Sequence, residues 1–358
     1  MNKQEKELFW GLCRFIDPDK EKLKKLIENG AATPGVLGMI FANRMAGIAY
    51  HTLRELDLLG KTNREFRNSL RDIATVNRRS NREFVGCLNF LSSELDACGV
   101  DYALLKGAYL CNLYPIGCRT SNDIDVLVAP EDVGKISARL KLAGFKQGYL
   151  KDWSFTPATR EQIIESRMTR GETVPFVRET RHPFIKYLEV DLNFSLDYKN
   201  GNGEILREML ARSKKVSVGD ANLKTLAPED FFLHLCSHLY KEATTLPWIK
   251  MGRDMTLYKY CDLYLLLDGM SDTEISEVIE AAIKYGCAHE LAYSLKSAEA
   301  LFGVSREPIR AFLRNFSTER LDEVISPSDG KLYRYTESDI KKRFFCINRA
   351  SLLGEVSE

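Results

Sequence analysis

Two aspartates, Asp123 and Asp125, stand one residue apart at the start of the apolar stretch NDIDVLVA. In a β-strand, residues two apart project from the same face, so these carboxylates lie side by side while the alternate residues face the core. Two carboxylates held this close repel each other unless a cation or a proton lies between them. Oxygen ligands of this kind suit Mg²⁺, which takes one or two carboxylates together with substrate phosphates. The pair therefore predicts a site for Mg²⁺, with Mn²⁺ as the alternative metal.

A third acid, Asp191, lies in the stretch FIKYLEVDLNFSL, where polar and apolar residues alternate as in a half-buried strand. Neighbouring strands lie about 4.8 Å apart, so a carboxylate on the polar face of this strand can reach the same metals. Three carboxylates on adjacent strands can hold two metal ions that clamp the attacking and leaving oxygens of phosphoryl or nucleotidyl transfer. An Asp-x-Asp pair alone also occurs as turn-capping acids, so the interpretation as a site depends on the combination with Asp191.

Candidate phosphate ligands precede the aspartate pair. Lys106 and Gly107 fall where a short strand, VDYALLK, gives way to a short helix, GAYLCNLY. Glycine lets the backbone approach a phosphate closely, and a helix N-terminus offers free N–H donors to an anion. Arg119 and Ser121 stand just before the aspartates, where an arginine fork could bind the triphosphate from the other side. The plainer alternative is that Gly107 only marks a turn.

A later helical stretch, LHLCSHLYKEA, places His234, His238 and Lys241 at positions i, i+4 and i+7. No acid or third histidine stands at a zinc-type interval such as H-E-x-x-H, so hydrogen-bonded histidines at the edge of a core are the favoured interpretation. The alternative is that His238 and Lys241 face the cleft and contact the nucleotide or its acceptor.

Segments with helical periodicity flank, on both sides in the sequence, the α/β region that must position these side chains. Apolar residues three and four apart predict helices over 33–60 and 62–99, and again from about residue 226 onward. Strands and helices alternate between about residues 100 and 200, which indicates a small α/β layer. We also expect a loop over 317–335 and a terminal helix over 337–353. The predicted division is a helical region at 1–99, an α/β core at 100–225 and a helical domain at 226–358.

Composition restricts the kinds of partner. The 358 residues carry a net charge of +1, so no global field draws the chain to nucleic acid or to a membrane. The longest apolar runs are far shorter than a bilayer span, and the N-terminal residues do not have the layout of a signal peptide. Nine cysteines are scattered without a C-x-x-C pair, which is typical of reduced thiols in the cytoplasm and argues against a zinc site.

The segments LLKGAYLCNLYP, CRTSNDIDVLV and LEVDLNFSL together resemble the DNA polymerase β-like nucleotidyltransferases, and within them the bacterial group of uncharacterised nucleotidyltransferases. The resemblance implies an α+β fold, in which a small mixed β-sheet nucleotidyltransferase core is flanked by N-terminal and C-terminal helical regions. It matches Asp123 and Asp125 to the metal-binding pair, Asp191 to the acid that helps activate the acceptor hydroxyl, and Gly107 to the phosphate-turn glycine. Ala108 stands where a serine is common in the superfamily, so that hydroxyl is absent here, and Lys106, Arg119 or Ser121 could replace its contact with a phosphate.

The implied reaction transfers NMP from an NTP, with ATP as the first candidate, to a hydroxyl of a small molecule, peptide or protein, and releases pyrophosphate. Nucleic acid is the less favoured acceptor because the charge is near neutral and no aromatic residues are interleaved with basic ones. Two alternatives stay open: a catalytically silent nucleotide-binding or regulatory protein on the same fold, and a phosphotransferase. The P-loop signature G-x-x-x-x-G-K-[ST] does not occur, which excludes a P-loop kinase.

Overall fold

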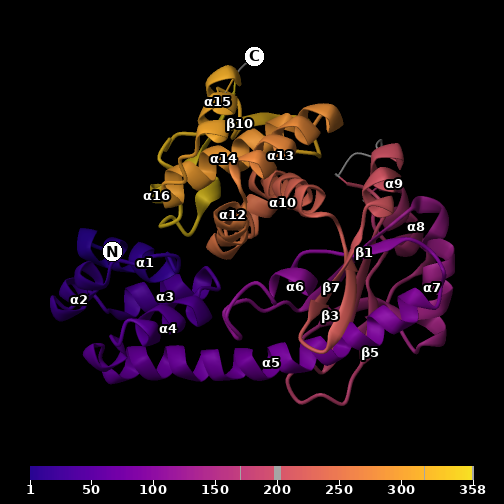
Figure 1. The fold of residues 1–358 in the computed structure, drawn as a ribbon, viewed down its shortest axis with the longest axis horizontal. Helices are drawn as coiled ribbons and strands as arrows, with labels where there is room; N and C mark the ends of the chain where they lie inside the picture. The colour runs from indigo at the N-terminus through magenta and orange to yellow at the C-terminus, as the bar shows by residue number, and fades with distance from the viewer. Residues whose placement is uncertain (170, 197–202, 318, 357–358) are drawn as a thin grey trace. The chain divides into compact units, whose positions relative to one another are not determined.

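The computed structural model describes residues 1–169, 171–196, 203–317 and 319–356 (Figure 1). The chain forms two compact units. One contains Met1–Leu70 and Phe232–Glu358, and the other contains Arg71–Phe231. The division into three regions at 1–99, 100–225 and 226–358, expected from the sequence, stays a prediction.

The unit of residues 71–231 is built on a mixed six-stranded sheet in the order β1-β2-β6-β5-β3-β4. Strand β2 pairs with β6 in parallel, and the other pairs of neighbours are antiparallel. This sheet, together with the many helices, confirms the expected α+β class. The strands are β1 (Tyr102–Leu104), β2 (Asp123–Val128), β3 (Lys146–Lys151), β4 (Ser154–Pro157), β5 (Phe176–Glu179) and β6 (Tyr187–Asn193).

The long helix α5 (Arg64–Asp96) contributes most of its length to the same unit. Its start is capped by Asn63, whose side chain accepts a hydrogen bond from the Phe66 amide at 2.9 Å. Its second half presents Phe84, Leu88 and Leu91 at helical spacing, and all three are buried in the core. The helix expected over 62–99 is thus confirmed, and its apolar stripe explains why it lies on a sheet.

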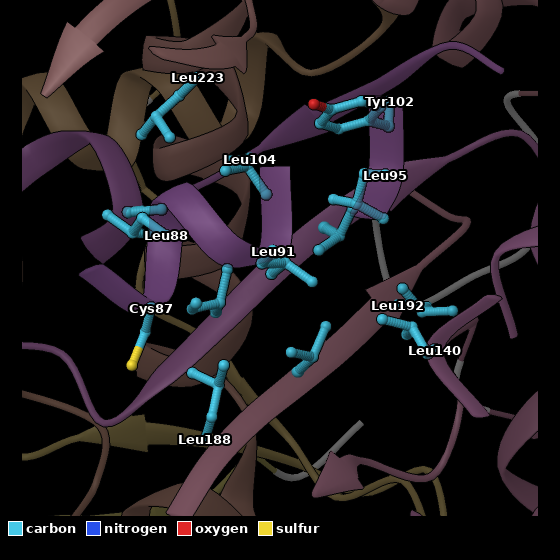
Figure 2. Packing of buried hydrophobic residues seen from close by; sticks show 14 of the residues in the cluster. Cys87, Leu88, Leu91, Leu95, Tyr102, Leu104, Leu140, Leu188, Leu192 and Leu223 are labelled. Atoms are coloured by element: carbon cyan, nitrogen blue, oxygen red, sulfur yellow. The ribbon is translucent and has the colours of Figure 1, made fainter. Parts of the chain in front are cut away.

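The core of this unit lies on one face of the sheet (Figure 2). Figure 2 shows Leu88 and Leu91 of α5 in one cluster with Leu188 and Leu192 of β6, and Leu140 of α7 (Val133–Leu142) beside Leu192. Alternate residues of β2 belong to the same core and are fully buried: Ile124, Val126 and Val128. The residues between them, including both aspartates, therefore project from the opposite face.

Shorter elements connect and flank the sheet. Only four residues form the helix after β1, so the helix-dipole part of the phosphate argument is weak there. The short elements are α6 (Gly107–Leu110), a 3₁₀ turn at Pro130–Asp132, α8 (Arg160–Thr169), α9 (Gly203–Ala211), and the hairpin of β7 (Lys214–Val218) and β8 (Ala221–Thr225).

The other unit is mainly helical. Its helices are α1 (Lys3–Cys13), α2 (Lys20–Glu28), α3 (Pro34–Ala42), α4 (Ala46–Glu55), most of α10 (Pro228–Ala243), α11 (Leu246–Lys250), α12 (Leu257–Gly269), α13 (Asp272–Tyr285), α14 (Ala288–Phe302), α15 (Glu307–Asn315) and α16 (Ile340–Arg343). The stretch expected to be helical over 33–60 forms two helices, α3 and α4, and a 3₁₀ turn at Leu59–Lys61. The break falls at Arg44, whose φ of 56° is incompatible with a continuing helix.

Two expectations for the C-terminal part are wrong. The predicted loop over 317–335 contains β9 (Val324–Ile325) and β10 (Leu332–Tyr335), which form a small sheet with β11 (Leu353–Glu355). The predicted terminal helix is reduced to α16 and a 3₁₀ turn at Arg349–Leu352. Arg343 and Arg349 both reach buried or half-buried aspartates, and one straight helix would direct these two side chains about 120° apart.

No helix within the described residues is long and apolar enough to cross a membrane. All nine cysteines are free thiols, as their spacing predicts.

Candidate active site

The parallel pairing of β2 and β6 brings four acidic residues together in two adjacent pairs. Asp125 lies opposite Asp191, and Asp123 lies opposite Glu189. Because side chains alternate along both strands, all four project from the face that does not carry the core. The three aspartates singled out in the sequence therefore lie on neighbouring strands of one sheet face.

Carboxylate oxygens of Asp123, Glu189 and Asp191 lie within 4.8 Å of one another, close enough to ligate one metal ion. Glu189 is the member that the sequence did not single out. The signal for it is its position two residues before Asp191 on the same face of an alternating strand. What turns this position into a site is the register with Asp123, which the sequence does not specify.

Asp125 has different partners. Its Oδ1 accepts a hydrogen bond from the Nζ of Lys106 at 2.8 Å and another from the Nδ2 of Asn193 at 3.3 Å. The Asp125 side chain is only 9% exposed, so the ammonium group balances a largely buried charge. Lys106, expected at the phosphates, thus contacts the aspartate pair in this structure.

We call the sheet surface formed by Asp123, Asp125, Glu189 and Asp191 the acidic face. Its four carboxylates outnumber the one ammonium group, that of Lys106, with which the contacts above pair them. Burial raises the pKa of Asp123, and the neighbouring Asp125 carboxylate raises it further; Lys106 and a hydrogen bond from Ser121 lower it in part. Burial, followed by repulsion from Asp125 and Asp123, raises the pKa of Asp191 well above its usual value. Burial, followed by repulsion from Asp123 and then Asp125, raises the pKa of Glu189.

These observations fit a divalent cation. The donors are carboxylate oxygens, which Mg²⁺ and Mn²⁺ prefer, and their mutual repulsion is the property that a bound cation would relieve.

The turn at Gly107 is packed against Ser121 in the loop of residues 119–122, which precedes the aspartates of β2 and is called the aspartate loop below. A Cβ added to Gly107 would lie 2.2 Å from the Oγ of Ser121 and 2.4 Å from its Cβ, so any larger residue would displace that serine. The Oγ of Ser121 in turn donates to Oδ1 of Asp123 at 3.2 Å. Ala108, next in the chain, is fully buried, so this position offers no surface to a phosphate. Glycine is therefore required here by close packing rather than by an unusual φ angle.

Residues 31–303 match the protein family described as uncharacterised nucleotidyltransferase. The chain belongs to this nucleotidyltransferase family. None of the curated proteins matches the sequence.

Two solved structures are similar over part of the nucleotidyltransferase chain. One is an antigenic nucleotidyltransferase-like protein from Paracoccidioides brasiliensis, 16% identical, with a TM-score of 0.35 over 63% of this chain and 99% of the other. The second is the antibiotic-resistance factor ANT(2'')-Ia, 10% identical, with a TM-score of 0.35 over 59% of this chain and 97% of the other.

Arg119 of this nucleotidyltransferase lies in the loop before β2 and is 9% exposed. Its guanidinium donates to the carbonyl oxygen of Thr120, and its own carbonyl oxygen accepts from the Nδ2 of Asn81 at 2.9 Å. The backbone of this loop is therefore tied to α5. The expected contact between Arg119 and the triphosphate stays a prediction.

The histidines of α10 belong to the helical unit of the nucleotidyltransferase. The rings of His234 and His238 are stacked, with centroids 6.5 Å apart, and Nε2 of His238 lies 3.3 Å from Oε2 of Glu242. The same Glu242 oxygen lies 2.6 Å from Nζ of Lys259. These contacts favour the interpretation as a polar cluster at the edge of a core. The role of His238 and Lys241 toward nucleotide or acceptor stays a prediction.

Proposed function

We propose that this nucleotidyltransferase transfers NMP from an NTP, with ATP as the first candidate, to a hydroxyl group of a small molecule, peptide or protein. The observation that carries the proposal is the convergence of carboxylates on β2 and β6 in a member of this family. The acceptor oxygen would form a bond to the α-phosphorus, while the bond from that phosphorus to the β-bridging oxygen breaks. The products are the NMP-modified acceptor and pyrophosphate.

Each residue of the site has a proposed role. Asp123, Asp125 and Asp191 would hold Mg²⁺ or Mn²⁺, which supplies neutralisation of the triphosphate charge and a lower pKa for the acceptor hydroxyl. The Asp191 carboxylate would accept the proton of that hydroxyl. Lys106 would exchange Asp125 for a phosphate oxygen when nucleotide arrives, because both offer negative charge within reach of the same ammonium group.

The residues proposed to bind the phosphates, Arg119 and Ser121, lie in the loop before β2, and Gly107 packs against that loop. The small size of Gly107 lets Ser121 approach Asp123, which orients that carboxylate. Arg119 and Ser121 would supply donors to the triphosphate oxygens.

Thermal unfolding with each NTP, with and without Mg²⁺, tests the nucleotide site. A ligand present at a hundredfold its dissociation constant stabilises the folded state by about 2.7 kcal/mol, which raises the midpoint by a few degrees. We expect this rise for wild type with Mg²⁺ and its loss in Asp123→Asn/Asp125→Asn. Asp101→Asn is the matched control, because Asp101 is exposed and precedes β1 at the end of the sheet remote from the pair. No rise with any NTP would contradict the proposal.

The fate of the label distinguishes the reactions. NTP labelled at the α-phosphate should modify a component of a cell extract and release pyrophosphate. Transfer of a γ-label with release of NDP would instead indicate a phosphotransferase. Nucleotide binding without transfer of either label would indicate the catalytically silent alternative.

A further inference from the structure

Glu189 occupies a place on the sheet that an ordinary surface glutamate would not. It stands in the middle of β6 between Leu188 and Val190, which are buried in the core at 2% and 0% exposure. Its own side chain is half-buried on the opposite face and lies opposite Asp123 in the parallel register. A half-buried carboxylate next to another carboxylate destabilises the fold unless something positive joins it.

The polar contacts of the acidic face are unevenly distributed. Asp125 accepts from Lys106 and Asn193, and Asp123 accepts from Ser121. Across residues 1–169, 171–196, 203–317 and 319–356, no hydrogen bond or ion pair engages the carboxylate of Glu189 or of Asp191. These two groups, with Asp123, are the ones whose oxygens converge within 4.8 Å.

We infer that Glu189 is a metal ligand, and that it shares one metal position with Asp123 and Asp191 while Asp125 is paired with Lys106. The acidic face then has four carboxylates, and in the nucleotide-free protein Glu189 takes the place of Asp125 among the metal ligands. This inference rests on the proposed function, because the metal is the one that nucleotidyl transfer would use. It adds a ligand that the three-aspartate pattern does not contain.

Binding of Mn²⁺ to the nucleotide-free full-length protein tests the inference directly. The electron paramagnetic resonance signal of free Mn²⁺ gives the number of sites and the dissociation constant without any enzymatic turnover. We expect Glu189→Gln, which keeps the shape and removes one charged ligand, to weaken Mn²⁺ binding at least tenfold.

The matched control separates ligation from general charge. Glu172 is half-buried and close enough to Asp191 to raise the pKa of that group, but its oxygens are not among those that converge. Glu172→Gln should therefore weaken Mn²⁺ binding only a few-fold. Equal effects of the two substitutions would overturn the inference, because Glu189 would then act only through its charge.

Other outcomes distinguish this inference from the proposed function. If Asp123→Asn abolishes Mn²⁺ binding but Glu189→Gln does not weaken it, Glu189 is no ligand and the nucleotide site stands. If wild type binds no Mn²⁺ with or without ATP, the proposed function fails as well. If the glutamine variant does not fold, Glu189→Asp repeats the test, because it keeps the charge but shortens the side chain by one methylene. A Mn²⁺ affinity of Glu189→Asp equal to that of wild type would count against ligation by Glu189.

Discussion

Because burial and mutual repulsion raise their pKa values, carboxylates of the acidic face should make the metal-free protein less stable as the pH rises. The pKa of Asp191 is raised in the folded state, mainly by burial and then by its aspartate neighbours. The folded protein therefore binds this proton more tightly than the unfolded chain does. Its contribution to stability is present below the unfolded pKa, about 3.9, and is lost as the pH rises through the folded pKa.

Replacing this carboxylate should therefore stabilise the metal-free protein. In EDTA at neutral pH, we expect Asp191→Asn to raise the unfolding midpoint, by roughly 2–4 °C for each kcal/mol of repulsion removed. The difference from wild type should vanish below about pH 3, where the aspartate is protonated in both the folded and the unfolded state. With saturating Mg²⁺ the order should reverse, because only wild type gains binding free energy. A variant less stable than wild type in EDTA at neutral pH would contradict the account of uncompensated charge.

Gly107 gives a second prediction at the scale of one residue. Gly107→Ala places a methyl group 2.2 Å from the Oγ of Ser121, so the aspartate loop must shift. Overpacking of this kind costs about 1–3 kcal/mol, and the shift should also weaken NTP binding. Gly134→Ala on α7 is the matched control, since nothing lies within 4 Å of its added Cβ. Denaturant titration and nucleotide binding measure both effects.

A second substitution tests the cause. Ser121→Gly removes the two atoms that the new methyl group would meet, so Gly107→Ala/Ser121→Gly should recover stability relative to Gly107→Ala alone. If the double variant is as unstable as the sum of the two single ones, the close contact is not the reason for glycine here.

At the scale of elements, the sequence predicts those whose pattern is long and regular. Helix α5 and strand β6 follow from apolar residues at helical and alternating spacing. Strands β3, β4 and β5 were not expected from the sequence. In β3 the side-chain pattern is interrupted by Gly148, whose added Cβ would lie 2.3 Å from the carbonyl oxygen of Thr156 on β4. There the fit of two backbones, rather than hydrophobic alternation, determines the strand pair.

The sequence predicts which residues of the site share a strand face, but not which of them lie opposite one another on neighbouring strands. Alternation places Asp191 on the polar face of its strand, but it does so equally for Glu189 and Asn193. Which of them lies beside Asp123 is decided by the parallel register, and register is a relation between two strands rather than a property of either. Lys106 contacts Asp125 for the same kind of reason, because β1 and β2 are neighbours and the amide of Leu105, the residue before Lys106, donates to the carbonyl oxygen of Asp125 at 2.9 Å.

Helix α5 also holds the loop that carries the candidate phosphate ligands. The side chain of Asn81 accepts from the Gly117 amide at 3.0 Å and donates to the Arg119 carbonyl oxygen at 2.9 Å. Asn81→Ala should cost about 1–3 kcal/mol for each buried backbone group left unsatisfied, and it should weaken NTP binding by freeing the loop. Asn89→Ala, at an exposed position of the same helix, should do neither. Normal nucleotide affinity in a destabilised Asn81→Ala would show that the loop does not depend on α5.

At the scale of the whole molecule, the helical unit is assembled from the two ends of the chain, and the other unit is formed by the intervening sequence, residues 71–231. Local patterns identify the helices of both ends, but they do not show which helices pack together, because that depends on contacts distant in sequence. The hydrogen bond from the Leu257 amide to Oδ1 of Asn43, at 3.1 Å, is one such contact. The pair formed by Arg349 and Asp254 is another, and it involves a fully buried carboxylate.

This buried pair predicts a separation between stability and metal binding. Nε of Arg349 donates to Oδ2 of Asp254 at 2.7 Å, so Arg349→Met leaves a buried charge without its partner and should destabilise the helical unit by about 3–5 kcal/mol. Arg310→Met, which breaks an exposed pair with Glu307, should change the denaturation midpoint little. Both variants should bind Mn²⁺ as wild type does, because every carboxylate of the acidic face belongs to residues 71–231. A large loss of Mn²⁺ affinity in Arg349→Met under conditions where it is folded would mean that the metal site depends on the helical unit, and that the two units act as one in binding.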